Sequence, residues 1–322
     1  MTQDNTAAKR LYPKIEPYAV ESLAVSDRHT IVYEDVGPRD GRPALFLHGG
    51  PGVGITPDYR RFFDPAHYRQ ILVDQRGAGR STPHADITDN TTWHIVEDLE
   101  ALRVRLGFEN WVVMGGSWGS LLALCYAIKH PDRVAGIAIR GIFLGRQAEI
   151  DWIHAPGGAS AVYPDEWARY KALVPDARDN VQAYCELLAC DNEREALAAA
   201  HAWSRWEGSM NTVRPDPAAL EQMTNDHTAL SIARLESYYT ANNFFLETDN
   251  FVLDNADKIA HIPMHIINGR FDLICPSISA WELHRALPKS QLTIVPDGAH
   301  SPLDAGMTAE LVRAADALRA VD

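Results

Sequence analysis

The sequence has few cysteines, few basic residues and no long apolar run, and each shortage excludes a class of protein. Its four cysteines include no Cys-x-x-Cys pair, so we expect reduced thiols rather than a disulfide framework. With 30 basic against 43 acidic residues, the net charge of −13 argues against nucleic acid or an anionic membrane as partner. No stretch approaches the ~20 apolar residues that cross a bilayer. The first residues also lack the apolar core of a secretory signal, so we expect a cytoplasmic protein.

Motifs for metals and nucleotides are missing too. There is no His-Glu-x-x-His motif and no cysteine–histidine cluster with zinc spacing, and we interpret His261 and His265 as structural. The segment DQRGAGRS (74–81) lacks the Gly-Lys-Ser/Thr ending of a phosphate-binding loop. We expect it to form a rigid wall beside a site, with Asp74 and Arg76 in structural ion pairs. Neither a metal nor a cofactor is therefore expected.

The first 144 residues alternate short β-rich runs with helical patterns, which is typical of a mostly parallel α/β sheet. A helix is predicted over 90–107, because apolar residues recur at helical spacing, Asn90 or Thr91 can cap it and Gly107 can end it. A second helix is predicted from Trp118, ending near Pro131. The predicted strands are 29–37, 42–50, 68–77, 111–117, 134–143, 262–272 and 291–300.

The pattern changes after residue 144. Residues 145–245 are rich in alanine and tryptophan and have little β-pattern, so we expect a helical cap domain there. Strand–helix alternation then resumes and closes with a helix over 307–320. The predicted organisation is a core of 1–144 and 246–322 interrupted by the cap.

The segment Gly115-Gly116-Ser117-Trp118-Gly119 fits Gly-x-Ser-x-Gly, a strand-to-helix elbow that lifts a serine oxygen above a sheet. Such a tight turn needs neighbours with almost no side chain. Taken alone, the pentapeptide fits equally well a glycine-rich connection whose serine caps the next helix.

Two residues follow later strands in the order that a serine nucleophile requires. Asp272 lies in the Gly-containing loop just past the strand of the segment 262–272, and His300 lies just past the strand of the last segment. Each alone is more simply a turn former or a loop histidine. The carboxyl ends of parallel strands meet at one edge of the sheet. The position of Asp272 and His300 at two such ends, after Ser117 in the sequence, therefore favours a catalytic triad.

An oxyanion hole needs two backbone N–H donors. Trp118, directly after the nucleophile, is expected to supply one. The glycine-rich turn in LFLHGGPG (45–52) is expected to supply the other, with Gly50 preferred and Gly49 left open. The alternative is a plain strand-to-loop turn.

Together these motifs resemble one enzyme family. The segments that carry the resemblance are HGGPG (48–52), DQRGAGRS (74–81), GGSWGS (115–120), RGIF (140–143), GRFD (269–272) and DGAH (297–300). They look like the proline iminopeptidases, prolyl aminopeptidases of the α/β-hydrolase fold, from near residue 30 to the end. The resemblance implies an α/β-hydrolase core with an inserted helical cap.

The resemblance also implies the substrate-binding residues. WSRWEGS (203–209) and ARLESYY (233–239) are similar to family segments whose glutamates bind the imino group of N-terminal proline, which carries over to Glu207 and Glu236. Phe143 and Cys275 match positions expected to line the pocket for the proline ring. The physics agrees, because two carboxylates above an apolar pocket attract a secondary ammonium. By composition alone, either glutamate would instead be placed on a solvated helix face.

Three residues depart from the family pattern. Val53 stands where relatives often continue the glycine run, and Ile153 and His154 stand where aromatic residues are expected. These departures bear on the width of the pocket and the extended substrate preference, and leave the chemistry as it is.

The predicted function is a serine exopeptidase that releases N-terminal proline from peptides. Two alternatives remain open. One is a serine esterase or amidase of the same fold that acts on a small uncharged substrate, which shares the triad and differs at the two glutamates. The other is a binding protein that keeps the triad for sensing. The oligomeric state is left open.

Overall fold

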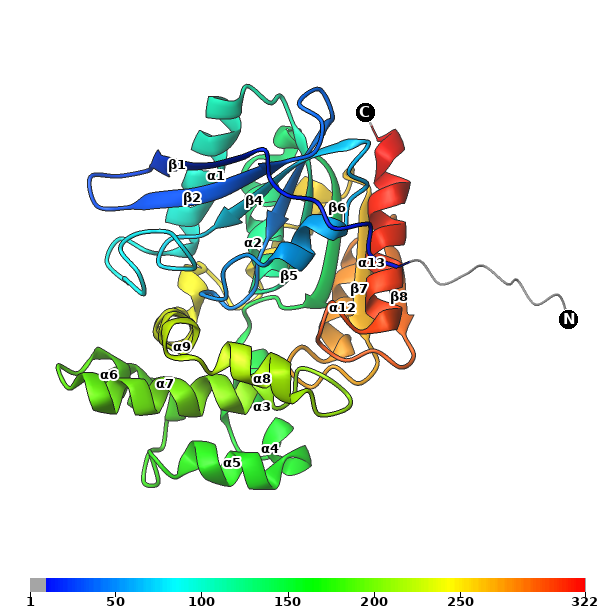
Figure 1. Cartoon of the computed structure of the whole chain (residues 1–322). Coiled ribbons are helices and arrows are strands. Elements are labelled where there is room, and N and C mark those ends of the chain that lie inside the picture. Colours follow the sequence, from blue (N-terminus) through cyan, green and yellow to red (C-terminus); the bar gives the residue numbers. More distant parts are fainter. Residues whose placement is uncertain (1–9, 322) are drawn as a thin grey trace, which may run out of the picture.

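An eight-stranded sheet forms the centre of the computed structural model, which describes residues 10–321 (Figure 1). The strand order is β1-β2-β4-β3-β5-β6-β7-β8. β1 and β2 pair antiparallel at one edge, and every pair from β4 to β8 is parallel. The strands are β1 (Ala19–Ala24), β2 (Thr30–Val36), β3 (Arg42–Leu47), β4 (Tyr68–Asp74), β5 (Trp111–Ser117), β6 (Val134–Ile142), β7 (Met264–Gly269) and β8 (Gln291–Val295).

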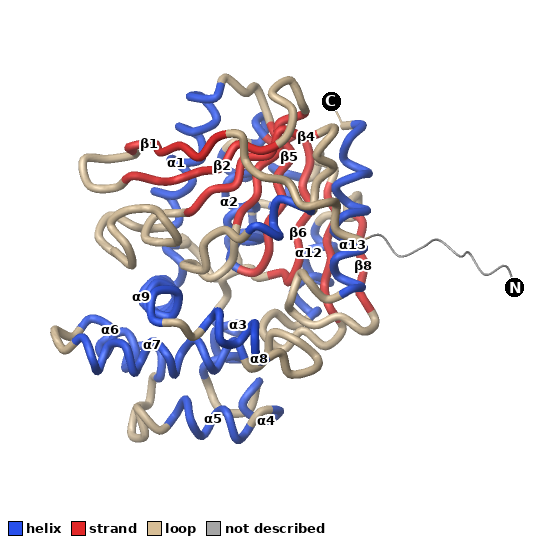
Figure 2. The backbone as a smooth tube through the Cα atoms, viewed as in Figure 1, coloured by secondary structure: helices blue, strands red, loops and turns tan. Residues whose placement is uncertain are grey.

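Helices cover both faces of this sheet (Figure 2). On β5, Val113 packs into a cluster with α1 and α2, whereas Val112 and Met114 pack into a second cluster with α13. This alternation follows from the two-residue period of a strand. The helices of the core are η1 (Pro57–Arg61), α1 (Thr92–Leu106), α2 (Trp118–Lys129), η2 (Pro131–Arg133), α10 (Phe251–Asp254), α11 (Ala256–Ile259), α12 (Ser277–Ala286), α13 (Ala305–Ala317) and η4 (Leu318–Ala320).

The predicted boundaries agree closely with the structure where local chemistry sets them. α1 is capped by Thr91, whose side chain accepts the His94 N–H, and it ends at Gly107 with a left-handed φ of 71°. These are the ordinary start and stop devices of a helix. The sequence did not indicate β1, because that edge strand is mostly exposed and lacks an alternating apolar pattern.

Residues 143–250, which follow β6, contain helices and no strand. Most of them lie on one side of the core, with α9 between the sheet and the other helices there (Figure 1). These helices are α3 (Gln147–His154), α4 (Ala159–Val162), α5 (Pro164–Lys171), α6 (Asn180–Ala189), α7 (Glu193–Gly208), α8 (Pro217–Met223), α9 (Asp226–Ala241) and η3 (Asn243–Phe245). The division of the chain into domains at residues 144 and 245 stays a prediction.

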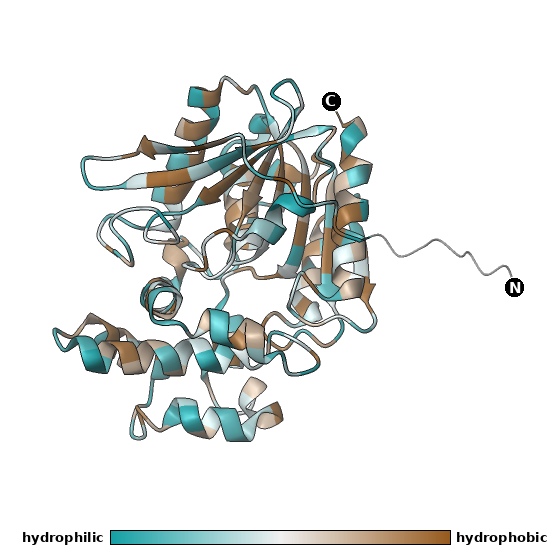
Figure 3. Cartoon of the chain, viewed as in Figure 1, coloured by the Kyte–Doolittle hydropathy of each residue, from teal (hydrophilic) through white to brown (hydrophobic). Residues whose placement is uncertain are grey.

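The cap has an aromatic interior. Tyr170 and Tyr184 stack with ring centroids 4.6 Å apart, and both lie against Trp203. In the core, by comparison, the interior is the central sheet, whose strands are mostly apolar (Figure 3). α7 and α9 pack directly on each other within the cap. Burial of this aromatic surface holds α5, α6 and α7 together.

Candidate active site

Ser117 occupies a strained turn between β5 and α2. Its backbone has φ 57° and ψ −129°, a conformation that a residue with a side chain seldom adopts. Although Ser117 stands at the cap position of α2, its side chain makes no capping hydrogen bond. The alternative of a helix-capping serine therefore lacks its defining contact, and strain of this kind is typical of functional sites.

The glycines of the elbow are required by close packing. A Cβ at Gly115 would overlap the carbonyl oxygen of Gly119, and a Cβ at Gly119 would overlap that of Leu47. The start of α2 thus presses against β5 and β3, as the motif predicts. Gly116 is needed for a different reason, because a Cβ there would overlap the side chain of Arg140.

Asp272 and His300 meet at the carboxyl ends of β7 and β8. The imidazole Nδ1 of His300 lies 2.9 Å from one carboxylate oxygen of Asp272 and 3.0 Å from the other. Asp272 also accepts the backbone N–H groups of Ile274 and Cys275, at 3.0 and 2.8 Å. A carboxylate held in this way keeps the Nδ1 proton on the histidine and leaves Nε2 free to accept one.

The sheet register brings this pair beside Ser117. Ser117 is paired with Ile142 across β5 and β6. The preceding residue, Gly141, has φ 53°, and a Cβ on it would lie 3.0 Å from the His300 ring and 3.3 Å from the Asp272 carboxylate. Three segments that are distant in the sequence therefore converge at one edge of the sheet, as Ser-His-Asp chemistry requires.

Sequence reasoning missed Arg140. This guanidinium is buried behind Gly116 and donates to the carbonyl oxygen of His300 at 2.9 Å. Burial lowers its pKa, and the nearby Asp272 acts in the opposite direction. Its signal in the sequence was a single charged residue within the otherwise apolar strand at 134–142. It supports the backbone that carries His300.

The glycine-rich turn after β3 lies over the serine. Gly50 lines the same pocket as Ser117 and Trp118, and a Cβ at Gly49 would lie 3.2 Å from the Cβ of Ser117. Both glycines are therefore next to Ser117. The assignment of the oxyanion donors stays a prediction.

The DQRGAGRS segment supports this turn from behind. Gln75 donates to the carbonyl oxygen of His48 at 3.1 Å, and its own side-chain oxygen accepts the Trp118 indole N–H at 2.7 Å. Asp74 pairs with Arg80. In a separate pair, Arg76 binds Asp98 at 2.6 Å. The sequence indicated ion pairs for this segment and missed the role of Gln75.

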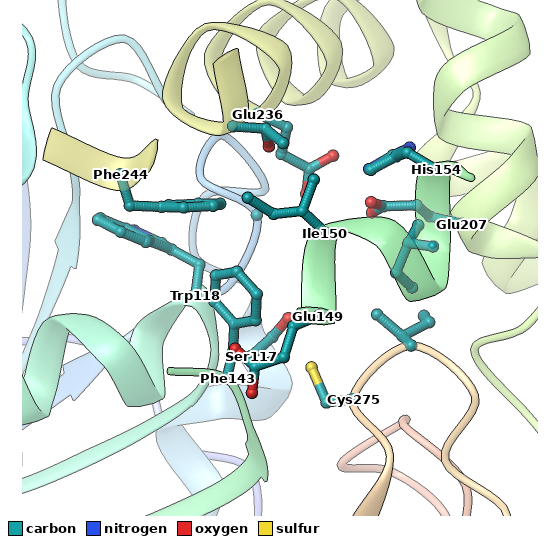
Figure 4. A pocket seen from close by; sticks show the side chains of 14 residues that line it. Ser117, Trp118, Phe143, Glu149, Ile150, His154, Glu207, Glu236, Phe244 and Cys275 are labelled. Atoms are coloured by element: carbon teal, nitrogen blue, oxygen red, sulfur yellow. The ribbon is translucent and has the colours of Figure 1, made fainter. Parts of the chain in front are cut away.

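A pocket opens above Ser117 (Figure 4). Seven of the expected site residues line it, whereas His300 and Asp272 do not. The complete lining is Gly50, Ser117, Trp118, Phe143, Glu149, Ile150, Ile153, His154, Glu207, Glu236, Thr240, Phe244, Ile274 and Cys275.

Glu207 of α7 and Glu236 of α9 both line this pocket (Figure 4). Burial raises the pKa of both carboxyl groups, and the charge of Glu207 raises that of Glu236 further. The Trp203 indole donates to Glu236 at 2.6 Å. Among residues 10–321, no Lys or Arg forms an ion pair with either glutamate. Glu236 is buried and Glu207 is half-buried, so the pocket holds two neighbouring carboxylates without a Lys or Arg partner.

The apolar wall of the pocket includes Phe143 and Cys275. Phe143 packs edge-on against Phe244, with ring centroids 4.7 Å apart. The Cys275 thiol is buried, which raises its pKa well above the usual range. Phe244, like Ile150, was not indicated by the sequence, because it lies in irregular backbone after α9 and has a φ of 52°.

A third carboxylate, Glu149, lines the pocket and was also missed. It accepts the backbone N–H groups of Leu144 and Arg146, both at 3.0 Å, and the hydroxyl of Ser279. These contacts satisfy it within the protein, so it differs from the pair formed by Glu207 and Glu236. Its role is to fix the start of α3.

The residues that depart from the family pattern lie in different places. Ile153 and His154 both line the pocket, whereas Val53 packs against the larger core cluster. His154 stacks on Trp203 with ring centroids 4.5 Å apart, and burial lowers its pKa to about 3. The neutral imidazole therefore forms part of the pocket wall beside the two glutamates.

Two further properties concern residues 10–321 as a whole. No group of three histidine, cysteine or carboxylate side chains there is arranged to hold a metal ion. None of the helices in this range is both long enough and apolar enough to cross a bilayer.

Comparison with known proteins shows both the fold and the family. A family model described as the alpha/beta hydrolase fold matches residues 43–306. The chain is 48% identical to the "Proline iminopeptidase" of Arabidopsis thaliana over 97% of this chain and 83% of that protein. It is 43% identical to the "Proline iminopeptidase" of Neisseria gonorrhoeae over 95% of this chain and 98% of that one.

Solved structures agree on the fold. An esterase from Exiguobacterium antarcticum, 22% identical, matches with a TM-score of 0.66 and covers 92% of this chain and 100% of its own. An esterase from Rhodococcus, 20% identical, matches with a TM-score of 0.62 over 96% of this chain and 100% of its own. At these identities the likeness concerns the fold alone.

Proposed function

The chain belongs to the proline iminopeptidase family of the α/β-hydrolase fold, and from this premise we propose that it releases N-terminal proline from peptides through an acyl-enzyme on Ser117. The observation that carries the proposal is a pair of carboxylates without a Lys or Arg partner, the buried Glu236 and the half-buried Glu207, in the pocket of the strained serine. An N-terminal proline presents a secondary ammonium one residue away from its scissile carbonyl.

The triad performs the chemistry in two steps. His300 takes the hydroxyl proton of Ser117 at Nε2 while the serine oxygen attacks the prolyl carbonyl carbon. Asp272, hydrogen-bonded to Nδ1, orients the ring and stabilises the imidazolium. The imidazolium then protonates the leaving amine as the C–N bond breaks. Water, activated by the same histidine, hydrolyses the prolyl-enzyme and restores the serine.

The remaining residues bind and orient the substrate. The backbone N–H groups of Gly50 and Trp118 hold the oxyanion that forms at the carbonyl. Glu207 and Glu236 hold the imino nitrogen, and Phe143 and Cys275 contact the ring. A substrate whose imino nitrogen is held by this pair presents its first carbonyl to Ser117, which makes the enzyme an exopeptidase. No metal or cofactor enters this scheme.

The decisive experiment compares three substrates with one enzyme preparation: proline arylamide, N-acetylproline arylamide and a simple aryl acetate. We expect rapid turnover of the first and poor turnover of the second, because acetylation removes the charge that the glutamates bind. Preferred hydrolysis of the acetylated amide or of the ester would instead support the esterase alternative. No turnover of any of the three would support a binding protein.

We also propose that the enzyme works in the cytoplasm on peptides. The absence of a membrane-spanning helix among the described residues agrees with this location. So do the four cysteines, all of which are free thiols.

A further inference from the structure

The glycine-rich turn after β3 touches the backbone of α9, the helix that carries Glu236. Gly52, two residues after Gly50, has φ 114°. A Cβ on it would lie 2.5 Å from the carbonyl oxygen of Ser231 and 2.8 Å from the Cα of Ile232. The turn and the helix therefore approach each other as closely as two backbones can, and only glycine fits between them.

A buried hydrogen bond joins the same two elements. The hydroxyl of Ser231, which is 1% exposed, donates to the carbonyl oxygen of Gly52 at 2.7 Å. The carbonyl oxygen of Thr228, one turn earlier in α9, lies 3.1 Å from the same hydroxyl and is the weaker acceptor. A serine within a helix commonly bonds only to its own preceding turn. Here its shorter bond reaches across from the cap to the core.

From this geometry we propose that Ser231 is a positioning residue, which fixes the oxyanion turn at a set distance from the helix that carries Glu236. This inference rests on the proposed function, in which Gly50 supplies an oxyanion donor and Glu236 binds the imino nitrogen. The bond holds the Gly50 N–H where the developing oxyanion will be. It thereby ties the carbonyl-binding end of the site to its ammonium-binding end.

α9 also offers a matched control. The hydroxyl of Tyr239 donates to the side-chain oxygen of Asn90 at 2.7 Å, a second buried bond between α9 and the core. Unlike Ser231, Tyr239 makes no hydrogen bond to the glycine-rich turn. Tyr239→Phe removes that bond and keeps the ring, which packs edge-on against Trp118 at 5.0 Å. Ser231→Ala and Tyr239→Phe thus each lose one buried hydrogen bond between α9 and the core, at different places along the helix.

The test measures kcat and KM for proline arylamide and aryl acetate in Ser231→Ala, Ser231→Thr and Tyr239→Phe. Full loss of an oxyanion donor costs about 10²–10³ in kcat, and a displaced donor costs less. We therefore expect Ser231→Ala to lower kcat about 10-fold on both substrates, with KM nearly unchanged. Ser231→Thr retains the hydroxyl and should restore most of the rate. Tyr239→Phe should lower Tm by a few degrees, as Ser231→Ala does, without changing kcat.

Phenylboronic acid gives a second measurement that a purely structural role would not affect. It forms a tetrahedral adduct on the serine oxygen, with one boron hydroxyl in the oxyanion hole. Its Ki should therefore rise in Ser231→Ala by about the factor that kcat falls. If the alanine variant does not fold, Ser231→Cys, with a weaker donor of similar length, carries the same comparison.

Three results would overturn the proposal. They are an unchanged kcat in the Ser231 variants, an equal loss of kcat in Tyr239→Phe, and a change confined to the KM of proline arylamide. Failure of the proposed function is distinguishable, because it would be seen in the unmodified enzyme as absent turnover of proline arylamide.

Discussion

Removing one charge from the carboxylate pair should separate recognition of the ammonium from the chemistry of the serine. Glu207→Gln and Glu236→Gln keep size and a hydrogen-bond acceptor, so the Trp203 indole retains a partner at residue 236. At a contact distance of about 4 Å and an effective dielectric of about 20, one ion pair amounts to about 4 kcal/mol. Because the pKa values of both carboxyl groups are raised and part of the charge is lost, we expect a loss of about 2–4 kcal/mol per substitution.

That loss corresponds to a fall of about 30- to 900-fold in kcat/KM for proline arylamide. The double variant should lose less than the sum, because both groups act on one charge. Hydrolysis of aryl acetate should change less than about twofold, because that substrate carries no charge. Glu221→Gln, on the exposed surface of α8, removes the same charge from the cap and serves as the matched control.

The same variants should be more stable than the unmodified protein. A carboxyl group whose pKa is raised by folding contributes stability below its unfolded value, and this contribution is lost as pH rises through its folded value. Replacing Glu236 by glutamine should therefore stabilise the unliganded protein by about 1–3 kcal/mol near pH 8 and by little near pH 4. Thermal unfolding at the two pH values measures this difference.

Equal losses on the charged and neutral substrates would refute the recognition role, because a glutamate that only supports the cap affects both alike. A destabilised Glu236→Gln at pH 8 would likewise refute the assignment of an uncompensated buried charge.

The remaining predictions concern the nucleophile, the pH profile, the pocket thiol and the elbow. Ser117→Ala should fold normally and lose several orders of magnitude in kcat, and substantial turnover by the purified variant would exclude the serine mechanism. For proline arylamide, kcat/KM should rise more steeply with pH than for aryl acetate, because deprotonation of the carboxylate pair adds to that of the general base. Parallel pH profiles for the two substrates would contradict this prediction. A metal chelator should leave the rate on both substrates unchanged. A bulky thiol reagent should inactivate the enzyme slowly, since Cys275 is buried with a raised pKa, and Cys275→Ala should remove the sensitivity; unchanged inhibition would point to another thiol. Gly116→Ala should lower the free energy of unfolding by about 2–4 kcal/mol, because its Cβ would overlap Arg140, and an unchanged Tm would contradict the packing argument.

The sequence by itself determined the fold and the order in which Ser117, Asp272 and His300 follow their strands, because both depend on signals that are local in the chain. Thr91 and Gly107 mark the ends of α1 through their own caps. The glycines around Ser117 indicate a tight turn because they have no side chain. Parallel strands then bring the residues after β5, β7 and β8 to one edge without further information.

Composition and periodicity could not place the groups around Ser117, and only the tertiary structure shows how they come together. Glu207 and Glu236 lie on helices whose sequences look like solvated faces, and the packing of α7 on α9 turns both toward one pocket. The contact of Arg140 with the His300 carbonyl and the bond from Ser231 to Gly52 also join residues that are distant in the chain. Periodicity and capping act over a few residues, whereas these contacts depend on how whole helices and strands pack together. That packing brings two carboxylates into the pocket above Ser117, where we propose that they bind the charged N-terminus of the substrate.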